Sequence, residues 1–224
     1  EHNAKQLRQY KLATLNFVGQ LLSSKGFLNK VMTQGNASEV FTQRMQPYYL
    51  QAVEIILKIV TYFTEFRDTY SVSKDAVPGI AKFWRAILKV VYDVLDKVNA
   101  LLPLDAFVNV ISELIQHTDS AIRRKAMNIF NEKIVSFEGH APEGSEDILV
   151  KMINNLTLVI QKESTSLSSE EDSAVNKQSA LLCIASLAKI LGNLYPGQFA
   201  EAIPIIIGAD SLQSGNPQLQ ISSL

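Results

Sequence analysis

Three consecutive cations, Arg123, Arg124 and Lys125, have the clearest capacity for binding chemistry in this sequence. They lie in the stretch HTDSAIRRKAMNIF, among apolar residues with helical spacing. Guanidinium and ammonium groups bind phosphates and carboxylates, so the cluster could contact nucleic acid, an acidic partner or acidic side chains of its own fold. Three cations alone are too few to define a nucleic-acid motif.

A helical wheel separates the three cations. The apolar residues of this helix share one broad arc, formed by Ile122, Ala126, Met127, Ile129, Phe130 and Ile134. Arg123 falls inside that arc, Arg124 points to the opposite side, and Lys125 lies beyond its far edge. Arg123 also follows Asp119 by four residues. We therefore predict that Asp119 and Arg123 form a structural ladder between helix pairs. Arg124 and Lys125 are left as a solvated face or as contacts to a partner or RNA.

No other group of residues has the spacing of a catalytic or metal site. The histidines His2, His117 and His140 have no ligand partners at useful spacing, and the single Cys183 cannot complete a zinc site. The sequence contains neither a glycine-rich phosphate loop nor a Gly-x-Ser-x-Gly elbow. We predict that the chain is not an enzyme, that it has no catalytic, cofactor-binding or metal residues, and that it takes no cofactor or small-molecule substrate.

Ser168 and Ser169 each precede an acidic residue by three positions. This pattern resembles a site for an acid-directed kinase. The same residues fit the start of a helix whose first turn carries Glu170, Glu171 and Asp172, and this interpretation is favoured. The sequence leaves phosphorylation open.

The composition is that of a globular chain with a sizeable core. Of its 224 residues 47% are hydrophobic and 19% charged, and 21 Lys and Arg against 22 Asp and Glu give a net charge of −1. Such a balance provides no bulk attraction to nucleic acid. There is no signal-peptide pattern, and the apolar runs are far shorter than the ~18 residues of a membrane span, so no membrane is expected. Both ends are already helical, which predicts a segment of a longer chain.

Helical periodicity dominates the sequence and predicts an all-α fold with essentially no sheet. Pro47 is expected to kink or restart the helix in which it lies. The predicted helices cover residues 2–23, 26–33, 38–70, 76–102, 105–116, 120–135, 145–162, 172–193, 199–208 and 217–224.

Paired helices joined by short turns recur along the chain. Aligning Ile122, Val175 and Leu219 places second helices about 53 and 44 residues apart, near the ~40–47 residues of HEAT or armadillo repeats with insertions. Residues 1–224 are therefore predicted to form a single α-solenoid of stacked HEAT-type helix pairs. Its parts are N-terminal helices over 1–75, HEAT helices over 76–135 and further HEAT-like helices over 145–224.

The stretch from Phe83 to Ile134 resembles the C-terminal region of one family. The resemblance is carried by FWRA (83–86), YDVLDKVNALLP (92–103) and IRRKAMNIFNEKI (122–134), and more loosely by NKQSALLCIASLAKILG (176–192). The family is that of HEAT repeat-containing protein 1 and U3 small nucleolar RNA-associated protein 10. DKVNALLP is typical of this family and not of HEAT repeats in general.

The resemblance implies a non-catalytic scaffold in ribosome biogenesis. Such a protein resides in the nucleus, in the nucleolus, and is part of the small-subunit processome. It acts in pre-rRNA transcription and maturation of the small-subunit rRNA. Its expected partners are other processome proteins and the U3 small nucleolar ribonucleoprotein, with pre-rRNA as a further candidate. The alternative is a HEAT scaffold of another system, such as nuclear transport or a phosphatase complex. That scaffold would share Asp119 and Arg123 but has no reason to carry DKVNALLP.

Overall fold

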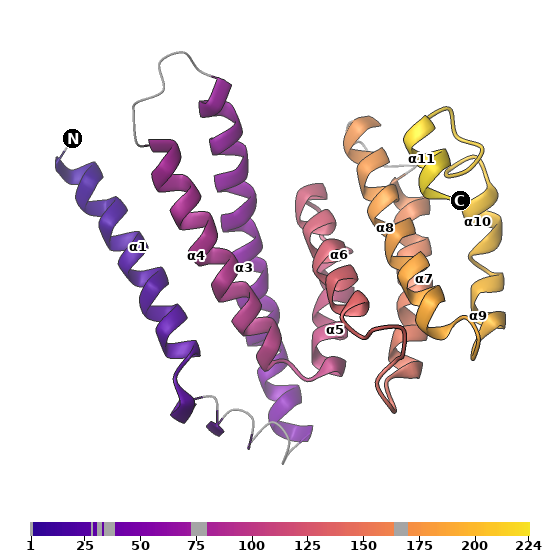
Figure 1. Cartoon of the computed structure of the whole chain (residues 1–224), viewed down its shortest axis with the longest axis horizontal. Coiled ribbons are helices and arrows are strands. Elements are labelled where there is room, and N and C mark those ends of the chain that lie inside the picture. The colour runs from indigo at the N-terminus through magenta and orange to yellow at the C-terminus, as the bar shows by residue number, and fades with distance from the viewer. Residues whose placement is uncertain (1, 28, 31–32, 34–38, 73–79, 164–169) are drawn as a thin grey trace. The chain divides into compact units, whose positions relative to one another are not determined.

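A computed structural model of the chain shows helices joined by turns and loops (Figure 1). It describes residues 2–27, 29–30, 33, 39–72, 80–163 and 170–224, and within these ranges there is no β-strand. The predicted all-α solenoid class is therefore confirmed. The chain forms two compact units, residues 1–106 and residues 107–224. This division groups the helix that begins at Ile80 with the helices before it, whereas the sequence prediction placed a boundary near residue 75.

The described part of the first unit contains three long helices: α1 (His2–Leu22), α3 (Glu39–Val72) and α4 (Ile80–Leu101). α4 packs against both α1 and α3 (Figure 1). The centre of this packing is a buried cluster with partly buried neighbours, namely Val60, Ile87, Leu88 and Val91 with Leu12, Leu15, Ile56, Ile59 and Phe83. The apolar residues of α4 recur at three and four residue intervals, so one face of the helix is buried and the other is exposed.

Gly19 is buried where α1 packs against α4, and a Cβ added to it would make only ordinary van der Waals contacts. A Cβ at this position would lie 3.7 Å from Cγ2 of Val94 and 3.8 Å from Nζ of Lys97. The Lys97 ammonium donates to the carbonyl oxygen of Gly19 at 3.2 Å, near the C-terminal end of α1. A cation is favoured there because the carbonyl ends of the helix dipoles point toward it.

The sequence predicts a kink or a restart at Pro47, and the restart is absent. α3 continues through Pro47 for 34 residues in all. A proline inside a helix leaves one carbonyl without its backbone donor. Pro47 itself is exposed, and the helix continues through it.

The second unit contains most of α5 (Leu104–Leu114), together with α6 (Ser120–Val135), α7 (Glu146–Glu163) and α8 (Glu170–Leu191). α8 packs against α6, α7 and the short α11 (Pro217–Ser222), so it occupies the centre of this unit. Among the described helices only α8 has the length and apolar composition of a membrane span, and most of the qualifying window is buried inside the protein. Packing against several helices accounts for the apolar character of α8.

The helix predicted over residues 199–208 is wrong as a single element. The structure has two short helices there, α9 (Pro196–Ala200) and α10 (Ile203–Ile207). Pro196 and Pro204 each lie in the first turn of a helix. Proline is tolerated in that turn because the N–H it lacks would have no partner within the helix, so Pro204 favours a new start over a continuous helix.

The core of the second unit predicts a large effect of truncation at Phe130, whose side chain has no exposed surface. Phe130→Ala should lower the free energy of unfolding by about 3–5 kcal/mol, because it removes a buried ring and leaves a cavity. Val135 on the same helix is 62% exposed, so Val135→Ala should change stability by less than about 0.5 kcal/mol. Urea denaturation followed by circular dichroism measures both, and equal losses for the two variants would contradict this packing.

Candidate functional site

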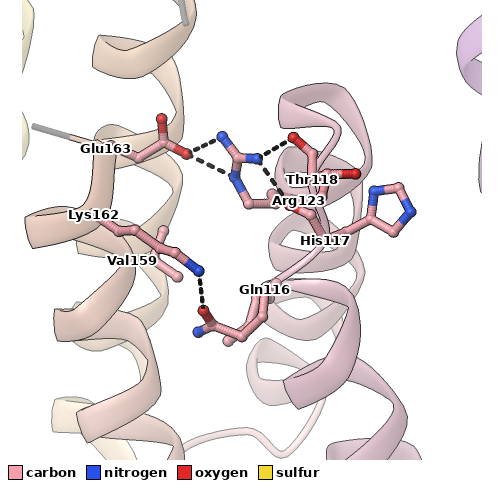
Figure 2. A pocket seen from close by; sticks show the side chains of 8 residues that line it. Gln116, His117, Thr118, Arg123, Val159, Lys162 and Glu163 are labelled. Atoms are coloured by element: carbon pink, nitrogen blue, oxygen red, sulfur yellow. Dashed lines mark hydrogen bonds and ion pairs between the residues drawn. The ribbon is translucent and has the colours of Figure 1, made fainter. Parts of the chain in front are cut away.

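The candidate site is a junction between helix pairs in the second unit, centred on the side chain of Arg123 (Figure 2). Arg123 lies in the first turn of α6 and is 8% exposed. Its guanidinium extends from α6 toward the C-terminal end of α7, across the turn that joins α5 to α6 (Figure 2). The position fits the helical wheel, which placed Arg123 inside the apolar arc.

The guanidinium has partners on two sides. Toward α7, Nε donates to Oε1 of Glu163 at 2.7 Å, and Nη2 forms an ion pair with the same oxygen at 2.5 Å. Toward the turn, Nη1 donates to the carbonyl oxygens of His117 and Thr118 at 2.8 Å and 2.9 Å. The planar fork of an arginine suits this arrangement, because one side chain can bind a carboxylate and a pair of carbonyls at once. Arg123 therefore connects the α5–α6 turn to the end of α7.

Glu163 is the carboxylate at the centre of this junction, and its side chain is 2% exposed. It is the last residue of α7, where the helix dipole disfavours a negative charge. Burial disfavours the charge further, so the carboxylate depends on its donors. Besides Arg123, the amide of Asn176 in α8 donates to the same oxygen, Oε1, at 2.9 Å. One carboxylate thus links α6, α7 and α8.

The predicted pairing of Asp119 with Arg123 needs correction. The Asp119 side chain caps α6 by accepting a hydrogen bond from the backbone N–H of Ala121 at 2.9 Å. The backbone N–H of Asp119 donates to Nδ1 of His117, also at 2.9 Å. Asp119 was expected to supply the carboxylate of the ladder, because it lies four residues before Arg123. Its short side chain instead accepts a hydrogen bond at the N-terminus of its own helix. Glu163, forty residues after Arg123, is the acid of the ion pair.

The predicted free basic pair, Arg124 and Lys125, also needs correction. Nη1 of Arg124 lies 3.5 Å from Oδ1 of Asp172 in the first turn of α8, and the two side chains are 30% and 46% exposed. Lys125 is half-buried and likewise interacts with the rest of the protein. The wheel located these residues outside the apolar arc, but it could not show that a neighbouring helix begins beside them. They do not form an isolated basic patch.

The contacts repeat along the chain in the predicted register of Ile122, Val175 and Leu219. Arg124 and Lys177 are equivalent in this register, and each pairs with an aspartate further along the chain. Nζ of Lys177 lies 3.4 Å from Oδ1 of Asp210. Gln220, equivalent to Arg123, donates to the carbonyl of Ser214 at 2.8 Å, six residues back. Arg123 makes the same bond to a carbonyl six residues back, so α6 and α11 share this contact, while the equivalent Asn176 of α8 donates to Glu163 instead.

Two residues of the junction were missed from the sequence, Glu163 and Asn176. Asn176 occupies the position equivalent to Arg123, and both side chains converge on Oε1 of Glu163. A signal was present, because the tetrapeptides DSAI (119–122) and DSAV (172–175) mark equivalent helix starts. The structure begins α8 at Glu170, so Asp172 lies inside the first turn and is available to Arg124.

A hollow of about 230 Å³ adjoins this junction. It is lined by apolar side chains of α7 and the α5–α6 turn, and by Gln116, His117, Lys162 and Glu163 (Figure 2). Lys162 donates to Oε1 of Gln116 at 3.2 Å across its mouth. The buried charges of Arg123 and Glu163 neutralise each other. None of the residues that line the hollow is a nucleophile hydrogen-bonded to a base. Among the described residues there is also no group of three His, Cys, Asp or Glu that could hold a metal ion. The arrangement holds helices together.

Two further expectations concern the start of α8. Ser168 and Ser169 lie outside the described residues. Glu170, Glu171 and Asp172 lie in the first turn of α8, as predicted. Their carboxylates are favourable there because the helix dipole presents free N–H groups at this end.

Cys183 packs α8 against α6. Its thiol is buried and its Sγ lies 3.2 Å from the carbonyl oxygen of Met127, to which it donates. Burial raises the pKa of the Cys183 thiol to about 12, because the thiolate would lose its hydration. A thiol held protonated in this way is a core residue and a poor nucleophile.

The fold and the junction define a class of protein: an α-helical repeat protein in which consecutive helix pairs are joined by buried polar contacts. Over 90% of its length, the chain is 31% identical to HEAT repeat-containing protein 1 of Danio rerio and 32% identical to that of Homo sapiens. Over its full length it is 28% identical to the Dictyostelium discoideum homolog. The chain is therefore a homologue of HEAT repeat-containing protein 1, and the family predicted from the sequence resemblance is confirmed.

The chain spans about 9% of the length of the zebrafish and human relatives. No family model matches it, and no solved structure matches it. The similarity covers nine-tenths of the chain, far more than the stretch that carries the sequence resemblance.

Arg123 and Arg124 should differ strongly in their effect on stability. Arg123→Ala leaves the buried Glu163 carboxylate without its cation and should cost about 3–5 kcal/mol. Arg124→Ala removes a partly exposed pair at 3.5 Å and should cost less than about 1 kcal/mol. Thermal and urea denaturation of the two variants measure the difference. Equal shifts in melting temperature would show that the junction contributes no more than a surface pair.

The buried thiol predicts a pH dependence. The thiol of the unfolded chain ionises near its ordinary pKa of 9.0, while the folded chain holds the proton up to about pH 12. The folded state therefore binds more protons in this window, and its stability should fall with rising pH by up to about 1.4 kcal/mol per pH unit. Because other groups also titrate there, the measurement is the difference between the wild-type chain and Cys183→Ala. A difference that stays constant from pH 8 to pH 11 would contradict the burial of the thiol.

Proposed function

We propose that this chain is a segment of a non-catalytic scaffold in ribosome biogenesis. The scaffold would act in the small-subunit processome, in the nucleolus, during pre-rRNA transcription and maturation of the small-subunit rRNA. The observation that carries the proposal is the homology to HEAT repeat-containing protein 1 over nine-tenths of the chain, together with the family's role as implied by the resemblance.

The geometry of the second unit agrees with a scaffold. Several of its buried polar groups join helices: Glu163 accepts from both Arg123 and Asn176, and Lys177 pairs with Asp210. Repeat proteins of this kind present extended helical faces to partners and need no reactive centre. A catalytic role would require a shaped site with a positioned acid, base or nucleophile, and the hollow beside Arg123 supplies none of these.

The expected partners are processome proteins and the U3 small nucleolar ribonucleoprotein. Protein contacts are favoured over broad RNA binding, because the net charge of the chain is −1. Arg124, a candidate for RNA contact, forms an ion pair with Asp172. This pair reduces the attraction of the Arg124 guanidinium for a phosphate. Lys125 also interacts within the protein, so it is a weaker candidate for RNA contact.

The proposal predicts that the full-length protein co-sediments with U3-containing pre-ribosomal particles only while this segment is folded. Phe130→Asp should break the second unit, reduce the co-sedimentation several-fold and lower the level of mature small-subunit rRNA, since it places a charge in the core. Val135→Asp is the matched control on the same helix, at an exposed position, and should leave both unchanged. Northern blots for U3 across a sucrose gradient provide the measurement.

The alternative function makes a different prediction in the same experiment. A HEAT scaffold of nuclear transport or of a phosphatase complex would leave U3 sedimentation and small-subunit rRNA unchanged in both variants. That result, obtained with a full-length protein that is stably expressed, would overturn the ribosome-biogenesis proposal and retain the helical repeat architecture.

A further inference from the structure

We draw no further inference here: the strongest candidate, the hollow of about 230 Å³ between α7 and the α5–α6 turn, belongs to the Arg123–Glu163 junction already described, and nothing in the structure shows what would occupy it.

Discussion

The carboxylate of Glu163 is the constraint on which the second unit depends. It is buried at the end of a helix, where both desolvation and the helix dipole oppose its charge. The charge is tolerated because Arg123 and Asn176 direct their N–H groups at the same oxygen from two neighbouring helices. The relative placement of α6, α7 and α8 is therefore fixed by a requirement for donors, in addition to the apolar packing around Phe130 and Cys183. Sliding of one helix past another would disrupt the apolar packing and would also separate the buried Glu163 carboxylate from its donors.

Other contacts recur in register along the chain. Arg124 and Lys177 hold equivalent places and each reaches an aspartate further along, while Arg123 and Gln220 each bond a carbonyl six residues back. Equivalent contacts at different helices suit a repeat architecture, since each helix pair packs mainly on its neighbours. Homology to HEAT repeat-containing protein 1 agrees with this arrangement.

The sequence predicted the helices well because their apolar periodicity is local information. It also located Arg123 correctly, since a wheel needs only the residues of one helix. It could not identify Glu163 as the partner, because that depends on how one helix pair stacks on the next. Proximity in sequence favoured Asp119 instead, and the capping of α6 overrode it. The start of α8 at Glu170 similarly placed Asp172 beside Arg124, which no property of the α6 helix alone could show. The division of residues 199–208 into two helices follows from Pro204, a local signal that the apolar pattern outweighed.

The central claim is that Arg123 and Glu163 stabilise the second unit through each other, and a double-mutant cycle tests it most directly. Arg123→Ala, Glu163→Ala and the double variant would be unfolded in urea and compared with the wild-type chain. The account predicts a coupling energy of at least about 1.5 kcal/mol, with the double variant more stable than the sum of the single losses implies. Losses that add to within about 0.5 kcal/mol would contradict it, because they would mean that the two side chains contribute independently.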